Sequence, residues 1–448
     1  MPTVKTPVSN NLVQNNSLIV SAKRSSNERQ GVHSWHPYYA GYSESFVKSV
    51  INSSNLHTNS LILDPWHGSG TTSLVAGRKS IKSVGFDTNP VMNLFSQAKN
   101  GIIVQEKKQA FKIREKINKN YLSKNYDVSE NDPLLDFSSK SLCSCIRNLY
   151  SCIKNQEFEQ LKFDKEVTSR FENTPSFQNY IQSFFYASLF LTARKLGEYK
   201  SASNPTWIKN KDDKPVVKKS KFLLEFNSQF EKMILDLESS SIIPSSKISN
   251  LSLNGDSRRL PIKDNSFDAV ITSPPYLTRI DYAMSTRPEL FIFNDSYDLR
   301  SIRELTMGAP VIVNKKLKLN PNWGNSCRKF LDAVYNHESK ASRSYYYPNF
   351  LQYFNDADYS LREIVRTLKR NGKAFIVVQS SYFKECEIKL GDFYVEILKN
   401  FKLPIKTKII YRESVKGHMA HVNTKSREYK DDKTFYEEVI FIEKEFRT

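Results

Sequence analysis

The segment FDAVITSPPY, residues 267–276, places a serine, two prolines and a tyrosine directly after a short apolar stretch. Residues 267–271 predict a buried strand. Pro274 and Pro275 end that strand abruptly, because neither has an N–H to donate to a neighbouring strand. The hydroxyl of Ser273 and the carbonyl oxygen of Pro274 are then hydrogen-bond acceptors that face no competing N–H donor from the prolines. We therefore expect a functional site where this strand ends.

A glycine-bearing turn follows an earlier predicted strand. Residues 60–64, SLILD, predict a short buried strand, and PWHGSG leads from it into the helix-forming segment TTSLVAGRK. Gly68 and Gly70 allow a tight turn, and the helix that follows presents free N–H groups to a ligand. The turn lacks the lysine of a phosphate-binding P-loop, which disfavours nucleotide triphosphate hydrolysis. Strand, glycine turn and helix in this order indicate an open, doubly wound α/β sheet.

Acidic residues lie at the ends of three predicted strands. Asp64 ends SLILD, Asp87 ends KSVGFD, and Asp256 follows ISNLSLNG. A carboxylate in the place of Asp87 accepts both hydroxyls of a ribose in dinucleotide folds, and one in the place of Asp256 could accept from the exocyclic amine of an adenine. The two positions bracket one adenosine at the edge of the sheet. After Asp87, NPVMNLFSQAKN predicts a helix capped by Asn89 with Pro90 in its first turn.

The rest of the chain is basic and interrupts the sheet twice. Its 448 residues carry 66 Lys and Arg against 47 Asp and Glu, a formal charge of +19. Such a charge favours a polyanionic partner, nucleic acid first and an anionic membrane surface second. We expect a flexible tail over residues 1–30, the cofactor-binding half of the sheet over 31–100, a basic and mostly helical insertion over 101–247, and the second half over 248–448 with a further insert near 287–348. The Phe and Tyr stripe in FQNYIQSFFYASLFLTARKL is expected to form core, not a base-stacking surface.

The last part of the sheet has a clear helix-to-strand unit. In DADYSLREIVRTLKRNGKAFIVVQ, apolar residues line one helical face. We expect Asn371 and Gly372 to end this helix and residues 375–378 to form a buried strand. The segments KTKIIYRE and EEVIFIEKE predict an antiparallel pair at the edge of the sheet.

Several classes of protein and site are disfavoured. No run of about 18 apolar residues occurs and the N-terminus lacks a signal-peptide core, so we expect a cytoplasmic protein without membrane contact. The five cysteines are odd in number and lack disulfide or four-ligand zinc spacing, so we expect unligated thiols and no metal site. His67 is expected on the surface of its loop more than against a cofactor. For His418 and His421, phosphate contact and a solvated loop stay equally open.

The motifs DPWHGSGTT, GFDTNP, NGDSRRLPIKDNSFDAVITSPPY and RIDYA together resemble the S-adenosylmethionine-dependent amino-methyltransferases of DNA, in particular the N4-cytosine group. The resemblance covers four strand ends and the upstream HPYYAGYSESFV. It implies a Rossmann-like class I methyltransferase sheet with an antiparallel edge strand and S-adenosyl-L-methionine as cofactor. The cofactor-binding residues that it implies are Tyr38, Ser43, Asp64, Pro65, Trp66, Gly68, Gly70, Thr71, Asp87, Asp256 and Ser257, and the implied catalytic residues are Ser273, Pro274, Pro275 and Tyr276.

The resemblance assigns roles to these positions. Asp87 would hold the ribose, Asp256 with Ser257 the adenine edge, and Thr71 would lie near the methionine carboxylate. The stretch from Tyr38 to Ser43 would pack over the methionine end. Trp66 stands where the family more often has Phe, so a narrower pocket is expected there.

The implied reaction suits the residue types of the Ser-Pro-Pro-Tyr loop. An exocyclic amine is a poor nucleophile because its lone pair is conjugated into the ring. Acceptors at Ser273 and Pro274 favour a pyramidal nitrogen and stabilise the positive charge that grows on it. Tyr276 could stack on the base, which must leave the duplex to reach the loop. No strong base is required, since the proton can leave to water after the methyl group has moved.

The resemblance also implies partners and leaves alternatives. It implies double-stranded DNA and suggests restriction–modification with a cognate endonuclease, while oligomeric state and the insert that reads the bases stay open. Serine at position 273 favours cytosine, whereas N6-adenine enzymes of this architecture more often have Asp or Asn. An RNA guanine-N2 methyltransferase and a non-catalytic DNA-binding scaffold are the remaining alternatives. Arg279 and Asp281 could shape the base pocket or pair with each other.

Overall fold

The computed structural model describes residues 19–36, 41–173, 175–199, 208, 213–240, 247–277, 280–293, 298–314, 316–415 and 433–445. Most of the expected N-terminal tail lies outside these residues. Tyr38, Arg279, His418 and His421 lie outside them as well, so the expectations for these four residues stay predictions.

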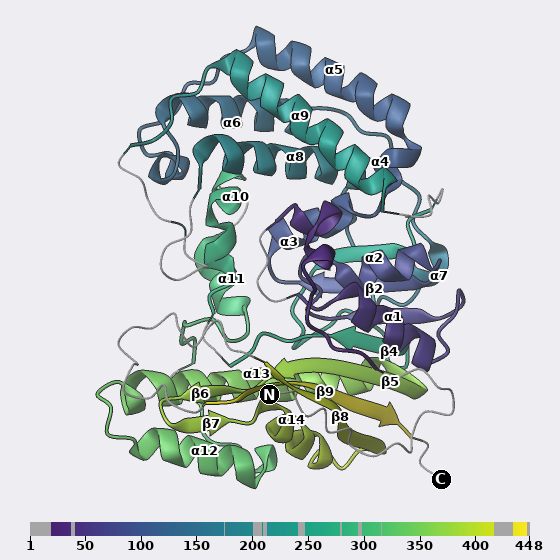
Figure 1. Ribbon diagram of the computed structural model, residues 1–448, viewed down its shortest axis with the longest axis vertical. Helices are drawn as coiled ribbons and strands as arrows, with labels where there is room; N and C mark the ends of the chain where they lie inside the picture. The colour runs from purple at the N-terminus through teal and green to yellow at the C-terminus, as the bar shows by residue number, and fades with distance from the viewer. Residues whose placement is uncertain are drawn as a thin grey trace.

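Seven strands form one sheet in the order β3-β2-β1-β4-β5-β9-β8 (Figure 1). Their bounds are β1 Leu61–Asp64, β2 Lys82–Asp87, β3 Asn250–Asn254, β4 Phe267–Thr272, β5 Leu368–Gln379, β8 Ile405–Val415 and β9 Phe435–Lys444. Strands β1 to β5 are parallel, and β9 runs antiparallel to both β5 and β8. The strand order reverses between β1 and β4, which is where a doubly wound sheet opens its ligand crevice. The predicted Rossmann-like fold class is confirmed, with the antiparallel strand one position inside the edge strand β8.

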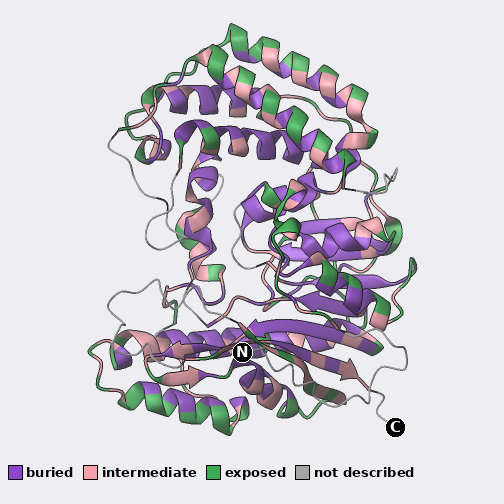
Figure 2. Cartoon of the chain, in the orientation of Figure 1, coloured by how far each residue is buried: buried purple, intermediate pink, exposed green. Residues whose placement is uncertain are grey.

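Helices cover both faces of this sheet, and its central strands are buried (Figure 2). The helices that frame it are α1 Glu44–Ser53, α2 Thr71–Arg78, α3 Pro90–Ala98, α13 Tyr347–Thr367 and α14 Leu390–Lys399. Phe46 of α1 packs in one cluster with Val377 of β5, whereas Ile364 of α13 packs in the other with Ile376. Successive residues of β5 therefore face opposite helix layers, as the alternation of a strand requires.

Two predicted helix ends had different outcomes. Asn89 caps α3, because its side-chain oxygen accepts from the N–H of Val91 at 3.1 Å, so this prediction is confirmed. The prediction that Asn371 and Gly372 end the following helix is wrong. Helix α13 ends at Thr367, since Leu368 already pairs with Phe267 of β4. Asn371 has φ +61° and lies where the register of β5 is irregular. Its tolerance of a left-handed conformation is therefore used within the strand and not at the end of the helix.

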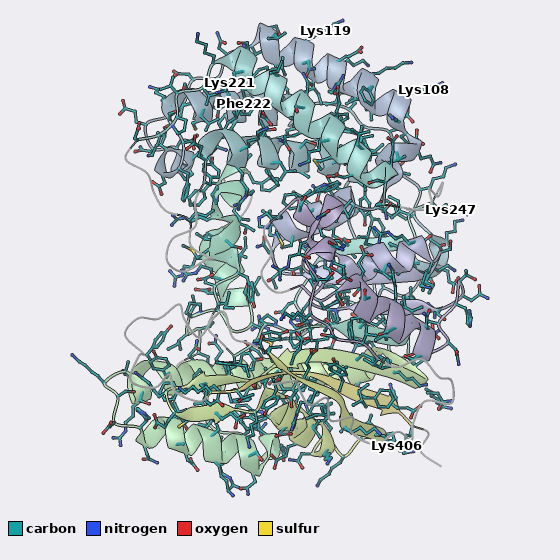
Figure 3. All side chains as sticks on the ribbon, in the orientation of Figure 1. Lys108, Lys119, Lys221, Phe222, Lys247 and Lys406 are labelled. Atoms are coloured by element: carbon teal, nitrogen blue, oxygen red, sulfur yellow. The ribbon has the colours of Figure 1, made fainter. Side chains whose placement is uncertain are left out.

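Most of the chain between β2 and β3 forms a helical layer at the top of the view in Figure 1. Beyond α3 this part of the chain contains α4 Ile102–Gln105, α5 Lys107–Ser123, α6 Lys140–Lys154, α8 Tyr180–Gly197 and α9 Lys219–Glu238, whereas α7 Lys165–Thr168 lies beside β2 of the sheet. Helix α8 packs on α3. Phe184, Phe185 and Phe190 of α8 are fully buried, which confirms that the aromatic stripe is core. Lys108 and Lys119 of α5 point outward from this layer (Figure 3).

A second group of helices lies between β4 and β5. These are α10 Arg287–Ile292, α11 Leu299–Leu305 and α12 Asn325–Asn336, and a separate hairpin after β5 pairs β6 Ser381–Phe383 with β7 Cys386–Ile388. Helices α10 and α11 connect the helical layer to the lower half of the molecule (Figure 1). The buried Arg147 of α6 donates to the carbonyl oxygen of Ile292 at 2.7 Å. Within the described residues, no helix has both the length and the apolar character needed to span a bilayer.

The aromatic core of the helical layer gives a stability prediction. The ring centroid of Phe230, a fully buried residue of α9, lies 5.1 Å from that of Phe185 and 5.3 Å from that of Phe184. Phe230→Ala should lower the free energy of unfolding by about 3–5 kcal/mol because it leaves a cavity among these rings. Leu224→Ala on the same helix is the control, since Leu224 is 74% exposed. Urea unfolding that shows equal losses in both variants would contradict this account.

Candidate functional site

A pocket, partly open to solvent, lies at the carboxyl ends of β1, β2, β3 and β4. Of the predicted site residues, those that line it are Pro65, Trp66, Asp87, Ser257, Ser273, Pro274 and Pro275. The other lining residues are Thr88, Asn89, Met92, Gly255, Tyr282, Ala283, Leu305, Thr306 and Met307. The pocket combines apolar walls with a few polar groups, as small-molecule sites do.

Asp87 is the acidic group of this pocket. One oxygen of its carboxylate accepts from the N–H of Gly68 at 3.0 Å and the other from the N–H of Asn89 at 2.8 Å. Burial raises the pKa of Asp87 to about 6, although both hydrogen bonds oppose the shift. Each carboxylate oxygen can accept a further hydrogen bond. Asp87 is thus held in place by its neighbours and still able to accept from the hydroxyls of a ribose.

The glycine turn between β1 and α2 is held in a tightly packed conformation. Gly70 has φ +84°, and a Cβ there would lie 2.0 Å from the hydroxyl oxygen of Ser96, so both backbone and packing require glycine. The buried Lys99 donates to the carbonyl oxygen of Ser69 at 3.0 Å, and burial lowers the pKa of Lys99 to about 7. The turn is therefore held in one conformation, and Gly68, Gly70 and Thr71 are not among the residues that line the pocket.

Arg24 brings a cation to the start of α2, and no sequence motif predicts this contact. Its guanidinium donates to the hydroxyl of Thr71 at 2.7 Å and to the carbonyl oxygen of Tyr42 at 2.9 Å. Arg24 lies in the stretch expected to be a flexible tail, and no spacing motif connects it to Thr71. A guanidinium at a helix N-terminus is suited to a carboxylate, which is the group that the resemblance places near Thr71.

Asp64 does not line the pocket, because its carboxylate is buried between strands. It accepts from the hydroxyl of Tyr42 at 2.5 Å, from that of Thr272 at 2.6 Å, and from the N–H of Trp66 at 3.3 Å. Burial raises the pKa of Asp64 against these hydrogen bonds. The predicted contact of Asp64 with a cofactor stays untested, and its place in the structure is that of a tie between β1 and β4.

Three other predicted residues have defined partners. The carboxylate of Asp256 forms an ion pair with Arg258 at 2.7 Å, and Arg258 also contacts Asp356 at 3.0 Å. The backbone beside Asp256 therefore lines the pocket while its side chain is engaged. The hydroxyl of Ser257 contacts that of Ser360 at 2.9 Å. Ser43 caps α1, where its hydroxyl accepts from the N–H of Phe46 at 3.0 Å.

The expectation that His67 is a surface residue is wrong. Its ring is buried, and its Nε2 lies 2.6 Å from the side-chain oxygen of Asn93. The ring fits because β2 has Gly85 below it, where a Cβ would lie 2.6 Å from the imidazole. Burial lowers the pKa of His67 to about 4.

The Ser-Pro-Pro-Tyr loop enters the pocket from the end of β4. The hydroxyl of Ser273 donates to the carbonyl oxygen of Val377 at 3.0 Å and lies 3.4 Å from the hydroxyl of Tyr276. Because its hydrogen is engaged, its lone pairs can accept from a substrate amine. Tyr353 donates to the carbonyl oxygen of Pro275 at 2.8 Å, which fixes the second proline from behind. Tyr276 itself does not line the pocket.

A further wall comes from Tyr282 and Ala283 of the RIDYA segment and from residues 305–307, which carry no recognisable motif. Leu305 and Met307 present apolar side chains, and the hydroxyl of Thr306 between them contacts that of Thr88 at 3.1 Å. Asp281 forms an ion pair with Arg303 at 2.7 Å, while the suggested pairing with Arg279 concerns a residue outside the described ranges and stays a prediction. Only the fold brings this segment to the end of β2.

Similarity in sequence to one known protein supports methyl transfer. No family model matches the chain. The Type II methyltransferase M.BsoBI of Geobacillus stearothermophilus is 26% identical over 378 residues, which cover 80% of this chain and 70% of the relative. TrmN from Thermus thermophilus aligns with a TM-score of 0.30 at 8% identity over 93% of this chain and 53% of its own length. The YcgJ protein of Bacillus subtilis aligns with a TM-score of 0.30 at 8% identity, over 90% of this chain and 98% of its own.

The similarity to a methyltransferase implies S-adenosyl-L-methionine as the cofactor. The pocket fits this molecule in its chemistry. Asp87 supplies an acceptor for ribose hydroxyls, and Met92, Leu305 and Met307 supply apolar walls for an adenine ring. Bound there, the cofactor would supply an electrophilic methyl group.

Asp87 gives a pH-dependent prediction for cofactor binding. The affinity for S-adenosylmethionine should fall as the pH drops through about 6, because protonation removes the charge and one acceptor position of Asp87. Asp87→Asn should weaken binding about tenfold or more at pH 7.5 and remove that pH dependence. Calorimetric titration between pH 5 and 8 measures both effects.

Asp127→Asn is the control, since Asp127 is exposed in the helical layer. A folded Asp87→Asn protein with unchanged affinity would exclude Asp87 from the cofactor site.

Proposed function

We propose that the chain is a DNA methyltransferase that transfers a methyl group from S-adenosylmethionine to the exocyclic N4 of cytosine in duplex DNA. The similarity to a Type II methyltransferase supports a DNA methyltransferase of this general kind. The formal charge of +19 favours DNA as the partner, because its phosphates are neutralised by Lys and Arg with release of counterions.

The observation that carries the proposal is one pocket with two chemically distinct ends. Asp87 lies on the side of β2, where a ribose is expected, and Ser273 with Pro274 lies at the end of β4. Ser273 has its hydrogen directed to Val377, so its oxygen faces the pocket as an acceptor. A target amine on one side and a sulfonium methyl group on the other would meet in a single crevice.

The reaction follows from how these residues hold the amine. Acceptors at Ser273 and Pro274 take the two amine hydrogens and draw the nitrogen lone pair out of conjugation with the ring. Further acceleration comes from holding the reacting atoms in line, an effect worth up to about 7–11 kcal/mol. The target base must leave the duplex to reach the pocket, at a cost of a few kcal/mol.

Cytosine is proposed as the target because Ser273 occupies the first loop position. N6-adenine methylation is the alternative with the same architecture. A role in restriction–modification beside a partner endonuclease is part of the proposal and rests on the sequence resemblance.

The base that is modified can be identified directly. The gene is expressed in a host without DNA methylation, and the DNA is digested to nucleosides and analysed by mass spectrometry. N4-methylcytosine is the expected product. N6-methyladenine would overturn the choice of base, and unmodified DNA beside modified RNA would overturn the proposal as a whole.

Ser273 should act on the methyl transfer step and not on cofactor binding. Ser273→Ala is expected to lower the single-turnover rate about a hundredfold, because one acceptor for the reacting amine is lost. The dissociation constant for S-adenosylmethionine should stay within about twofold. Ser266→Ala, at the other end of the same strand region, is the control and should leave the rate unchanged. An equal loss of cofactor affinity in Ser273→Ala would count against this role.

A further inference from the structure

We infer that Glu437 receives the proton that the target amine loses, through the hydroxyl groups of Ser273 and Tyr276, and thus acts as the proton acceptor of the site. The inference rests on the proposed function. It replaces release of the proton to water, which is the simplest expectation from the sequence.

The register of the sheet places Glu437 at the crevice. Glu437 is the third residue of β9 and pairs with Gln379 at the carboxyl end of β5. Because β9 runs antiparallel to β5, the start of β9 lies at the same edge of the sheet as the Ser-Pro-Pro-Tyr loop. The hydroxyl of Ser381, just beyond β5, donates to the carbonyl oxygen of Leu277 at 3.1 Å, which holds the residue after Tyr276 against this edge.

The side chains also share one face of the sheet. Val377 and Val439 pack with Ile271 in the cluster on the α1 side. Ser273 is two residues after Ile271, and Glu437 is two residues before Val439, so the alternation of strands directs both toward that face. Glu438, the neighbour of Glu437, faces the other side, where it accepts from the N–H of Gly391 at 3.2 Å.

Glu437 has the chemical properties of a proton acceptor. Its Oε1 is buried and has no hydrogen-bond partner within the described part of the chain. A buried unpaired carboxylate oxygen is costly, so such a group in a native structure calls for an explanation. Burial raises the pKa of Glu437 to about 7, and its charge in turn raises the pKa of Tyr276. Glu437 therefore lies within electrostatic reach of Tyr276 and is able to gain a proton near neutral pH.

The proposed proton path leads from the amine through Ser273 and Tyr276 to Glu437. The amine nitrogen forms its bond to the methyl carbon as the carbon–sulfur bond breaks, and it becomes cationic. Ser273 then turns its hydroxyl hydrogen from the carbonyl oxygen of Val377 to Tyr276, whose oxygen lies 3.4 Å away, and passes that proton on as it takes one from the amine. Tyr276 passes its proton to the Glu437 carboxylate. Both hydroxyls end as they began, the product amine is neutral, and Glu437 carries the proton until solvent removes it.

Charged and titratable groups from three elements face Glu437. Glu413 on β8, its direct cross-strand neighbour, raises the pKa of Glu437, whereas Lys23 and the N–H of Ala22 in the N-terminal segment lower it. Tyr276 faces Glu437 from the Ser-Pro-Pro-Tyr loop. After burial, the charge of Glu437 is also one of the causes of the raised pKa of Tyr411 on β8. Substitution of these groups can therefore shift the pKa of Glu437 while Glu437 itself stays unchanged.

The test is the pH dependence of single-turnover methyl transfer at saturating cofactor and DNA. The wild-type rate should rise with pH through an inflection near 7, because only the ionised carboxylate accepts the proton. Glu437→Gln should lower the plateau about a hundredfold and remove the inflection. Its cofactor affinity, measured by calorimetry, and its thermal unfolding should match the wild type, which a merely structural role would not predict.

Two neighbouring variants give opposite shifts. Glu413→Gln removes a like charge, so the inflection should move to lower pH. Lys23→Met removes a favourable cation, so the inflection should move to higher pH. A structural role of Glu437 predicts no such pair of shifts.

The outcomes separate this inference from the proposed function. An active wild type whose pH profile is unchanged in Glu437→Gln would overturn the relay and leave the methyltransferase proposal intact. A wild type that methylates no DNA, while binding the cofactor, would overturn the proposed function first. An inflection that does not move in Glu413→Gln or Lys23→Met would assign it to another group and overturn the relay.

Discussion

The buried carboxylate of Asp64 is the interaction on which the crevice depends. Hydroxyl groups of Tyr42 and Thr272 donate to it from a segment before α1 and from the end of β4. A buried carboxylate is costly unless it is fully hydrogen-bonded. Removing either hydroxyl would leave the buried carboxylate without one of its hydrogen bonds, which is energetically costly. The segment before α1, the end of β1 and the end of β4 are therefore held in one arrangement. Thr272 directly precedes Ser273, and Asp64 directly precedes the glycine turn, so both ends of the pocket are fixed from the same carboxylate.

The arrangement of the insertions can be understood from the fixed position of the Asp64 carboxylate. The sheet is assembled from strands that are far apart in the chain, and β2 pairs with β3 across the whole helical layer. The segment between Asp281 and Met307 returns over the pocket, and the N-terminal segment with Arg24 crosses to the start of α2. Both close the site from outside the sheet. The strands supply position, and the connections supply walls and charges, as in other open α/β folds.

What could be predicted from the sequence was local. Asn89 at its cap, the strand before Asp87 and the serine after β4 each depend on a few neighbouring residues. The features that were predicted wrongly depend on contacts between residues that are distant in the chain. His67 is buried because Gly85 on another strand makes room for its ring, and Asn371 lies in a strand because Leu368 had already joined the sheet. Arg24, Leu305 and Glu437 belong to no motif, since only strand order and packing bring Leu305 to the pocket, Arg24 to Thr71 and Glu437 to the carboxyl end of β5.

The central claim is that one crevice at the ends of β2 and β4 holds both the cofactor and the target amine. A crystal structure of the protein with S-adenosylhomocysteine, the demethylated form of the cofactor, tests it most directly. We predict density in the pocket, with the ribose hydroxyls within hydrogen-bond distance of the Asp87 carboxylate and the sulfur directed toward Ser273. A ligand bound elsewhere, or bound with its sulfur remote from Ser273, would contradict the account.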